Sequence, residues 1–292
     1  MLLDVVMLTK NSAKPSFEKC LISIKANVPV NRLIVIDAYS TDNTLDIINK
    51  FFPNSIIIQT KQPLARARKL GVSYVETEWF AFIDSDILLF PEWFKIVGDL
   101  RGEGIGGIQG ADQYANESLL KYLKWQENIW KKKFLRKKNE PLSIVDVNNF
   151  KKKWFRGLTH NTLIRTSCIK DWDPPAHLHI GEDHHLLLHV IKKGYKWLVV
   201  HTPVCKHYAF LNLTETMHRG FVEAQEVKKI TRRGYIERDE MWIDATAMNY
   251  LKLLGFSFWK GLVASLYEKD PRILLYKMCF YGSMLLGHFI PS

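Results

Sequence analysis

Short apolar runs alternate with amphipathic segments along the first third of the chain. Segments with helical spacing begin at Pro15, just after Asp42 and at Leu64, and Asp42 can cap the second of them. Strands separated by helices predict a parallel, doubly wound sheet. Four runs are almost continuously hydrophobic, as buried parallel strands are: LDVVML (3–8), RLIVID (32–37), SIIIQT (55–60) and WFAFID (79–84).

The pattern changes in the middle of the chain and again near its end. Residues 117–138 predict a helix that ends in the basic run KKKFLRKK, and we expect a mobile loop between it and a second basic run, KKKWFR (151–156). The strand NTLIR, a helix after Gly181 and the strand WLVVH then continue the first domain. The chain becomes helical and increasingly apolar from about residue 212. We therefore predict an α/β domain over residues 1–211 and a helical region over residues 212–292.

Polar side chains gather where the predicted strands end. In doubly wound sheets, ligands bind beyond the carboxyl ends of the strands, so these side chains are candidates for one binding site. They are Thr9, Asn11, Asp37, Lys61, Asp84 and Asp86.

Asp84 and Asp86 stand two residues apart where the fourth strand runs out, in FIDSDILLFP. Two carboxylates in a site that also receives a diphosphate suit Mg²⁺ or Mn²⁺. Such a metal would bridge phosphate oxygens and take up charge on the leaving group. The alternative is a pair of solvated turn aspartates, which the series of polar strand ends disfavours.

Four segments in this order resemble family 2 glycosyltransferases, which have the GT-A fold and use nucleotide-diphosphate sugars. The resemblance covers roughly residues 2 to 210. The segments are VVMLTKNSA, VIDAYSTDNT, LARARKLGVSYVETEWFAFIDSD and GEDHHLLLHVIKKGYKWLVV.

The resemblance implies a role for each polar strand end. Asp37 would bind the nucleoside of the donor, with Thr9 and Asn11 lining the same pocket, and Lys61 is a further donor-side residue. Arg68 matches the arginine of the family's Ala-Arg-Asn segment, although Lys69 replaces the asparagine. Asp84 would contact the ribose or a metal-bound water, and Asp86 the metal itself. Asp37 as a turn cap and Arg68 as an exposed helix charge are the alternatives.

The stretch GEDHHLLLH places two acidic residues in the first turn of a predicted helix. Direct displacement of a nucleotide by an acceptor hydroxyl needs a base, and a carboxylate at a helix start can supply it. The resemblance assigns this role to Asp183, with Glu182 as a second contact. Both residues could instead only complement the helix dipole.

The histidines of the same region allow a different hypothesis. His185 and His189 are four residues apart on one helix face, and His177 and His179 precede them, so a zinc hydrolase is an alternative. No cysteine ligand and no His-Glu-x-x-His order supports it.

Residues on the acceptor side are predicted from WFRGLTHNTLIR, which resembles the family segment beneath the acceptor site. His184, next to the predicted base, could orient the acceptor. His207, after the last strand, matches a position where some relatives supply a third contact to the metal or to the diphosphate. The acceptor-side candidates in the WFRGLTHNTLIR segment are Trp154, Arg156, His160 and Asn161.

Composition adds a statement about partners. The chain has 41 basic and 30 acidic residues, a net charge of +11, which favours an anionic partner. The basic runs lack the interleaved aromatic residues of a nucleic-acid-binding module, so nucleic acid is disfavoured. Four separated cysteines and no signal-peptide pattern at the N-terminus favour a reducing compartment.

The C-terminal segments 245–267 and 273–290 are long, apolar and aromatic. Lys252 and Lys260 interrupt the first, which is typical of a helix that lies in a membrane interface. Packing on the domain, an oligomer contact and a membrane-spanning hairpin are the alternatives. With the net charge, these segments predict a cytoplasmic protein that is peripheral on the anionic cytosolic face of the cell membrane.

The sequence thus predicts a metal-dependent inverting glycosyltransferase with Mn²⁺ or Mg²⁺ as cofactor. Its donor would be a UDP- or GDP-linked sugar, and its acceptor a glycan or a polyprenyl-linked sugar. A noncatalytic binder of sugar nucleotides is the main alternative, ahead of a zinc hydrolase and a nucleic-acid-binding protein.

Overall fold

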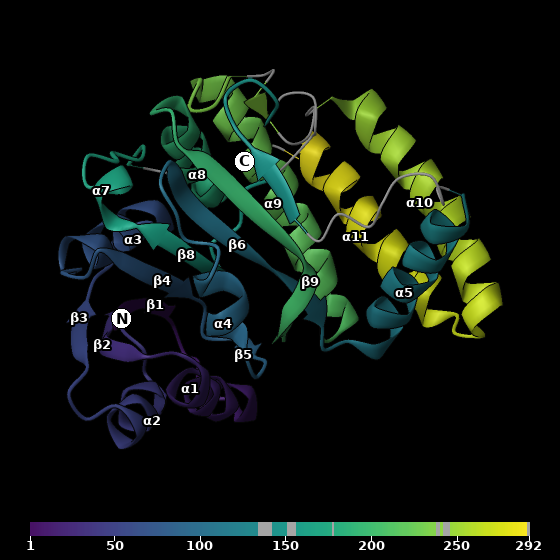
Figure 1. The fold of residues 1–292 in the computed structure, drawn as a ribbon. Helices are drawn as coiled ribbons and strands as arrows, with labels where there is room; N and C mark the ends of the chain where they lie inside the picture. Colours follow the sequence, from purple (N-terminus) through teal and green to yellow (C-terminus); the bar gives the residue numbers. More distant parts are fainter. Residues whose placement is uncertain (134–141, 151–155, 177, 238–239, 242–245, 291–292) are drawn as a thin grey trace. The chain divides into compact units, whose positions relative to one another are not determined.

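The computed structural model describes residues 1–133, 142–150, 156–176, 178–237, 240–241 and 246–290 (Figure 1). The chain divides into two compact units. The first comprises Met1–Gln113 and Pro141–His207, and the second comprises Tyr114–Glu140 and Tyr208–Ser292. Each unit is therefore built from two segments that are not consecutive in the sequence.

Parallel strands form one half of the sheet in the first unit, as the apolar runs predict. In Figure 1 they occupy the purple and blue part of the ribbon. In sheet order they are β3 (Ile56–Gln59), β2 (Val30–Asp37), β1 (Leu3–Thr9) and β4 (Trp79–Ile83). The central strands β1 and β4 are almost wholly buried, as is β2 over its last five residues, because helices cover both faces of the sheet there. The edge strand β3 is only partly buried, so the fully buried strand that its apolar run predicts is wrong.

Antiparallel strands extend the sheet beyond β4. The β4 strand pairs with β8, and β7 and β5 both pair with β9. The mobile loop that we predicted after the first basic run is wrong for residues 142–145, because these residues form β7. Its Val145 is fully buried opposite Trp197 of β9, which explains the pairing. The added strands are β8 (Asn161–Arg165), β6 (Ile105–Tyr114), β9 (Lys196–His207), β5 (Ile87–Leu89) and β7 (Leu142–Val145).

Alternate side chains of β1 face opposite layers of the unit. Val5 and Met7 belong to the core cluster that includes Phe17 of α1 (Pro15–Asn27). Val6 points the other way, where it meets Gly71 of α3 (Leu64–Ser73) so closely that a Cβ there would lie 2.5 Å from it. This alternation is what a strand period of two requires when both faces are buried.

Short helices complete the first unit and set the ends of the strands. The α2 helix (Thr44–Phe51) begins two residues after Asp42, whose Oδ1 accepts a hydrogen bond from the Thr44 N–H at 3.1 Å. The α8 helix (Glu182–Lys192) follows Gly181, which has a φ of 83°. Glycine adopts this left-handed conformation without the cost that a Cβ would add. The remaining helices are α4 (Trp93–Gly98) and α7 (Thr166–Ile169).

Four long helices make up the second unit: α5 (Glu117–Lys133), α9 (Leu213–Arg233), α10 (Ala247–Glu268) and α11 (Arg272–Phe289). The α11 helix packs against both α9 and α10. Glycines make the α9 contact close, because a Cβ on Gly220 would lie 2.4 Å from the Phe280 carbonyl oxygen. A Cβ on Gly287 would likewise lie 2.5 Å from the Phe221 carbonyl oxygen. Of the helices within the described residues, none has both the length and the apolar character needed to cross a bilayer.

Candidate active site

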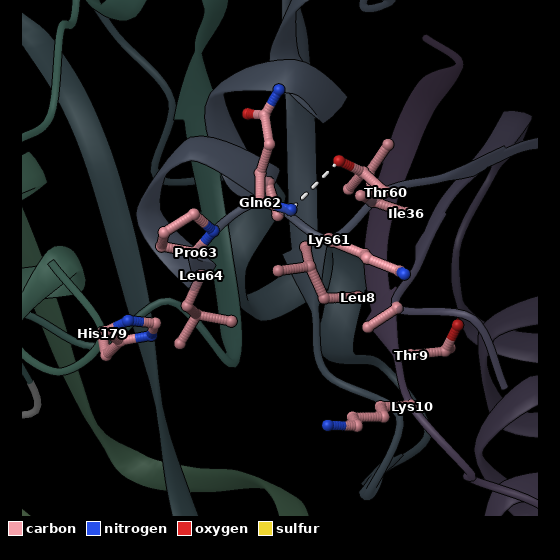
Figure 2. A pocket seen from close by; sticks show the side chains of 12 residues that line it. Leu8, Thr9, Lys10, Ile36, Thr60, Lys61, Gln62, Pro63, Leu64 and His179 are labelled. Carbon is pink, nitrogen blue, oxygen red and sulfur yellow. Dashed lines mark hydrogen bonds between the residues drawn. The ribbon is translucent and has the colours of Figure 1, made fainter. Parts of the chain in front are cut away.

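A pocket of about 450 Å³ opens at the carboxyl ends of β1, β2 and β3 (Figure 2). Thr9, Ala38 and Lys61 come from the three strand ends, and Leu64 and Ala67 come from the start of α3. In Figure 2 the Thr9 and Lys61 side chains lie on the opposite side from His179. Of the predicted polar strand-end residues, Thr9 and Lys61 line this cavity.

Asp37 lies beside this pocket but does not line it. Its side chain is fully buried, and its two oxygens accept hydrogen bonds from the Thr9 and Ser40 hydroxyls, the Ser40 N–H and the Gln59 amide. Burial raises the pKa of Asp37, but the hydrogen bonds from Ser40, Gln59 and Thr9 outweigh it and hold the pKa below its ordinary value. The ionised Asp37 side chain, with its four internal donors, therefore stabilises the loop at the end of β2. The residue next to it, Ala38, lines the pocket.

Asn11 joins the two loops that border the pocket. Its N–H donates to Ser40 Oγ at 2.8 Å, and its Oδ1 accepts from the Thr41 N–H at 2.8 Å. Asn11 has a φ of 48°, and an asparagine tolerates this conformation better than most residues. The Lys61 ammonium lies 5.5 Å from the ring centre of Tyr39, so it is held over this loop.

Arg68 connects the two acidic motifs of the sequence. Its Nη2 donates to Asp84 Oδ1 at 3.1 Å and its Nε to Glu182 Oε1 at 3.3 Å. The guanidinium is buried, and its carbon lies 5.2 Å from the ring centre of Phe82. Its third nitrogen, Nη1, has no hydrogen-bond partner among the described residues. The exposed helix charge considered for Arg68 is thus wrong, because the arginine is buried and contacts one buried carboxylate, Glu182, and one partly exposed carboxylate, Asp84.

Two carboxylates and two imidazoles meet at the end of β9. His207 Nε2 lies 3.4 Å from Asp86 Oδ2, and His207 Nδ1 lies 3.0 Å from Asp112 Oδ2. His160 stacks on His207 with ring centres 5.0 Å apart, and its Nε2 lies 3.8 Å from Asp112. One ligand atom from each of Asp112, His160 and His207 falls within 4.8 Å of the others.

The electrostatics of this cluster suit a divalent cation. Burial lowers the pKa of His207, but its hydrogen bonds to Asp112 and Asp86 raise it to about 10, so a cation that binds Nε2 would take the place of a proton between the same carboxylates. Burial lowers the pKa of His160, which keeps that ring neutral and available as a ligand. Its buried Nε2 lacks a hydrogen-bond partner within the described part of the chain. The donor set therefore fits a metal ion.

Glu182 and Asp183 occupy the first turn of α8, as predicted. Burial, and then repulsion from Asp183, raise the pKa of Glu182 to about 7. Asp183 accepts a hydrogen bond from the His184 N–H at 2.8 Å, and its other oxygen lies 4.0 Å from Nε of Arg156. Glu182 thus pairs with Arg68, whereas Asp183 lies near Arg156, a half-buried arginine of the predicted acceptor segment.

Three acceptor-side candidates remain: His184, Asn161 and Trp154. His184 is buried, and its Nδ1 accepts a hydrogen bond from the Gly157 N–H at 3.3 Å, so it fixes the segment next to Arg156. Asn161 is fully buried within the sheet and donates to the Gly110 carbonyl oxygen at 3.2 Å. Trp154 lies outside the described residues.

The two helix histidines of the zinc hypothesis have other partners. His185 Nδ1 accepts a hydrogen bond from the Trp172 indole at 3.0 Å, and His189 lies 3.3 Å from Asp171. His179 lines the donor-side pocket instead, and His177 is outside the described residues. Neither helix histidine belongs to the metal-binding group found within the part of the chain that the structure describes.

Asp112 is the site residue that the sequence did not reveal. It stands in the β6 run IGGIQGADQY, whose glycines resemble a loop more than a strand. Those glycines are needed by the packing, because a Cβ on Gly107 would lie 2.3 Å from the Trp197 ring. A lone aspartate between Ala111 and Gln113 is a weak signal even where the strand is recognised.

Comparison with known proteins agrees with this arrangement. The model of glycosyl transferase family 2 matches residues 4–156, just over half of the chain. The chain belongs to glycosyl transferase family 2. The matched residues include both aspartates at the end of β4 and all the pocket-lining residues except His179.

Among curated proteins, this family 2 chain is similar to glycosyltransferase SunS of Bacillus phage SPbeta and to the prophage-derived SunS of Bacillus subtilis strain 168. Each match is 42% identical over 77 residues. That segment is 26% of this chain but only 18% of the relatives' length.

Solved structures of transferases share the fold over most of the chain. The S. aureus TarS fragment 1–349 has a TM-score of 0.54 at 18% identity, covering 96% of this chain and 90% of that one. The mannosyltransferase PcManGT from Pyrobaculum calidifontis, in complex with GDP-Man and Mn²⁺, has a TM-score of 0.59 at 13% identity over 97% and 86%. Glucosyl-3-phosphoglycerate synthase from Mycobacterium tuberculosis, with Mn²⁺ and UDP, has a TM-score of 0.55 at 16% identity over 81% of both chains. These similarities confirm the predicted GT-A fold.

Proposed function

We propose that this family 2 chain is a metal-dependent inverting glycosyltransferase that moves a sugar from a nucleotide-diphosphate donor to an acceptor hydroxyl. One observation carries the proposal. Arg68 joins Asp84, at the end of β4, to Glu182, at the start of α8, beside a pocket at the strand ends. This contact between the two acidic motifs supports a single site in which the proposed donor, metal and base residues act together.

The donor nucleoside is assigned to the pocket of Figure 2. Its 450 Å³ lies within the usual size range of small-molecule sites. Thr9, Lys61 and the backbone at Ala38 would contact the nucleoside, with Asp37 and Asn11 holding the loops in place. Solved relatives are named as complexes with UDP-GlcNAc, UDP or GDP-Man, which supports a UDP- or GDP-linked donor.

Asp86 and His207 would hold the divalent metal, with Asp84 beside them and Asp112 behind His207. A bound divalent cation supplies charge neutralisation at the diphosphate that leaves. The mixed carboxylate and imidazole donors favour Mn²⁺ over Mg²⁺, because imidazole suits transition metals while Mg²⁺ prefers oxygen. Arg68 contributes a fixed positive charge next to the same phosphates.

Asp183 is the proposed base that takes the proton from the acceptor hydroxyl. Glu182, with its raised pKa and its Arg68 partner, is the less suitable of the two. Direct attack by the deprotonated hydroxyl on the anomeric carbon, with the nucleoside diphosphate leaving from the other side, inverts that centre. Arg156 and His184 would position the acceptor segment, and His160 would border the metal.

The acceptor is proposed to be a glycan or a polyprenyl-linked sugar, and the protein to act at the cytosolic face of the cell membrane. The excess of 11 positive charges supports an anionic partner of this kind. The division of roles between residues 1–211, as catalytic domain, and residues 212–292, as a membrane-associating region, belongs to the same proposal.

A thermal-shift screen tests the donor and metal assignments together. We expect one UDP- or GDP-linked sugar to raise the melting temperature with Mn²⁺ and to have little effect after chelation. Asp86→Asn should remove this gain, whereas Asp99→Asn, an exposed aspartate elsewhere in the unit, should keep it. Absence of stabilisation by every nucleotide sugar in the presence of Mn²⁺ contradicts the proposal.

The Asp183→Asn variant separates an enzyme from a noncatalytic binder. Donor hydrolysis or transfer should fall about 100- to 10,000-fold, the usual contribution of a general base, while donor affinity is retained. Asp171→Asn is the matched control, since Asp171 pairs on the surface with Lys193. Equal turnover of Asp183→Asn and the unmodified protein would exclude Asp183 as the base.

A further inference from the structure

The α10 helix is packed with its small residues inward. Its buried positions within the second unit include Ser257, Gly261, Ala264 and Ser265. A Cβ on Gly261 would lie 3.2 to 3.3 Å from atoms of Leu274 on α11, so this side forms a close helix contact. A helix of a water-soluble bundle usually buries its bulky apolar residues instead.

The bulky residues of α10 lie on the opposite side. Trp259 is 66% exposed, Leu266 is 72% exposed and Phe256 is 58% exposed. Helical spacing places these residues with Leu251, Val263 and Tyr267 on one continuous stripe, which we call the outer face of α10. A contiguous apolar surface of this length on a protein marks an interaction site.

The charged residues of α10 indicate which kind of partner its outer face would bind. The charged residues of α10 are Lys252, Lys260 and, at its last position, Glu268. The Lys260 ammonium lies 4.2 Å from the ring centre of Phe256, so its stem covers apolar surface while its charge stays near the rim. Two lysines among tryptophan, tyrosine and aliphatic side chains are complementary to an anionic lipid surface.

A second copy of the chain fits this face less well. A two-fold symmetric contact through α10 would bring the Lys252 and Lys260 pairs of both copies into one apolar interface. Only Glu268, at the end of the helix, could offset them. Within the described residues, no helix has the length and apolar character that crossing a membrane requires.

We propose that the outer face of α10 docks on an anionic lipid bilayer, with the helix lying in the plane of the interface. The apolar side chains enter the boundary between headgroups and acyl chains, and the two lysines contact lipid phosphates. Docking specifies the membrane association that the proposed function gives to residues 212–292, and it requires neither donor nor metal, so a failed donor screen would leave it testable.

Vesicle sedimentation with the full chain tests the docking. We expect the protein to sediment with vesicles of equal parts phosphatidylcholine and phosphatidylglycerol, and much less with pure phosphatidylcholine. Trp259→Glu combined with Leu266→Glu should weaken binding by about tenfold or more, since both the apolar burial and the charge match are lost. Lys252→Gln combined with Lys260→Gln should lower it roughly fivefold per lysine on the anionic vesicles alone.

The control carries the same change of charge at another place. Ile22 and Val147 are exposed apolar residues of the first unit, so Ile22→Glu with Val147→Glu should bind vesicles as the unmodified protein does. Circular dichroism and donor thermal shifts verify that each variant is folded.

Three results would overturn the proposal. One is the absence of sedimentation with anionic vesicles. Another is an equal loss of binding in the control variant. The third is a dimer in sedimentation velocity that Trp259→Glu with Leu266→Glu dissociates while vesicles capture neither form, which would assign the outer face to a second copy.

Discussion

Asp112 and Asp86 hold His207 from opposite sides of its ring. The Nδ1 contact to Asp112 is 3.0 Å and the Nε2 contact to Asp86 is 3.4 Å. A carboxylate behind a metal-binding histidine fixes the ring orientation and increases its basicity. Asp112 is therefore a positioning residue for His207 in the proposed metal site.

Replacement of Asp112 should weaken metal binding without removing a donor contact. We expect Asp112→Asn to lower Mn²⁺ affinity about 10- to 100-fold, as is usual for partners of metal-bound histidines. Titration of free Mn²⁺ by electron paramagnetic resonance measures the effect, with Asp99→Asn as control. Metal-free nucleotide binding should stay unchanged, and an unaltered Mn²⁺ affinity would rule out this role.

Glu182 gives a prediction about pH. Its pKa rises from an ordinary 4.5 to about 7 on folding, so the folded chain binds this proton more tightly than the unfolded chain. The resulting stability is complete below the unfolded pKa and is lost as the pH rises through the folded pKa. Relative to Glu182→Gln, the unmodified protein should lose on the order of 2 kcal/mol of unfolding free energy between about pH 4.5 and 7.5.

Denaturant melts of both proteins across this pH range provide the measurement. Glu103→Gln, at an exposed position, serves as control and should follow the unmodified protein at every pH. Parallel pH profiles for Glu182→Gln and the unmodified protein would contradict the assignment of a proton to Glu182.

At the residue scale, local pattern revealed some site residues and concealed others. Asp84 and Asp86 directly follow an apolar strand, and Glu182 and Asp183 open a periodic helix, so their type and place were readable. The contact between Arg68 and Glu182 joins residues 114 positions apart, and no local pattern contains it. Two internal partners of Asp37, Thr9 and Gln59, are likewise distant in sequence. Ser40 is only three residues after Asp37, and its two hydrogen bonds are those that the turn-cap alternative predicted.

At the scale of elements, the α9 and α11 contact depends on glycine. The Cβ that Gly287→Ala adds would meet the Phe221 carbonyl oxygen, a backbone atom that cannot rotate away. Gly282→Ala on the same helix adds a Cβ with nothing within 4 Å. We expect Gly287→Ala to destabilise by about 1–3 kcal/mol and Gly282→Ala to stabilise by about 0.5–1 kcal/mol.

Thermal or urea unfolding of the two variants compares one substitution in two environments. Similar changes in unfolding free energy for both would show that the close contact of α9 and α11 is not required. Because the two positions share a helix, helix propensity cannot explain a difference between them.

The parallel strands and long helices followed directly from hydrophobic period, whereas β6 and β7 did not. The β7 strand has four residues, and it is identified by its partner β9 rather than by its own sequence. The antiparallel half of the sheet therefore depends on pairings between distant segments, which periodicity does not encode.

At the scale of the whole molecule, the two compact units should respond differently to ligand. The pocket, Arg68 and the proposed metal-binding residues Asp112, His160 and His207 all belong to the first unit. In calorimetry, nucleotide sugar and Mn²⁺ at a hundredfold excess over Kd should increase the unfolding free energy of the first unit by about 2.7 kcal/mol. The unfolding transition of the second unit should keep its temperature. Gly287→Ala should lower only the second, and a single transition that both perturbations move would contradict this independence.

The tight fit between Gly107 and Trp197 has a consequence for how such a sequence can change over time. Trp197 fills the space above Gly107, and its indole donates to Gln109 at 3.3 Å, three residues before Asp112. A larger residue at position 107 is tolerated only after Trp197 becomes smaller, so the two positions are expected to vary as a pair among descendants. Substitution of Trp197 can thereby shift the position of Asp112, although none of the proposed metal-binding residues has itself been substituted.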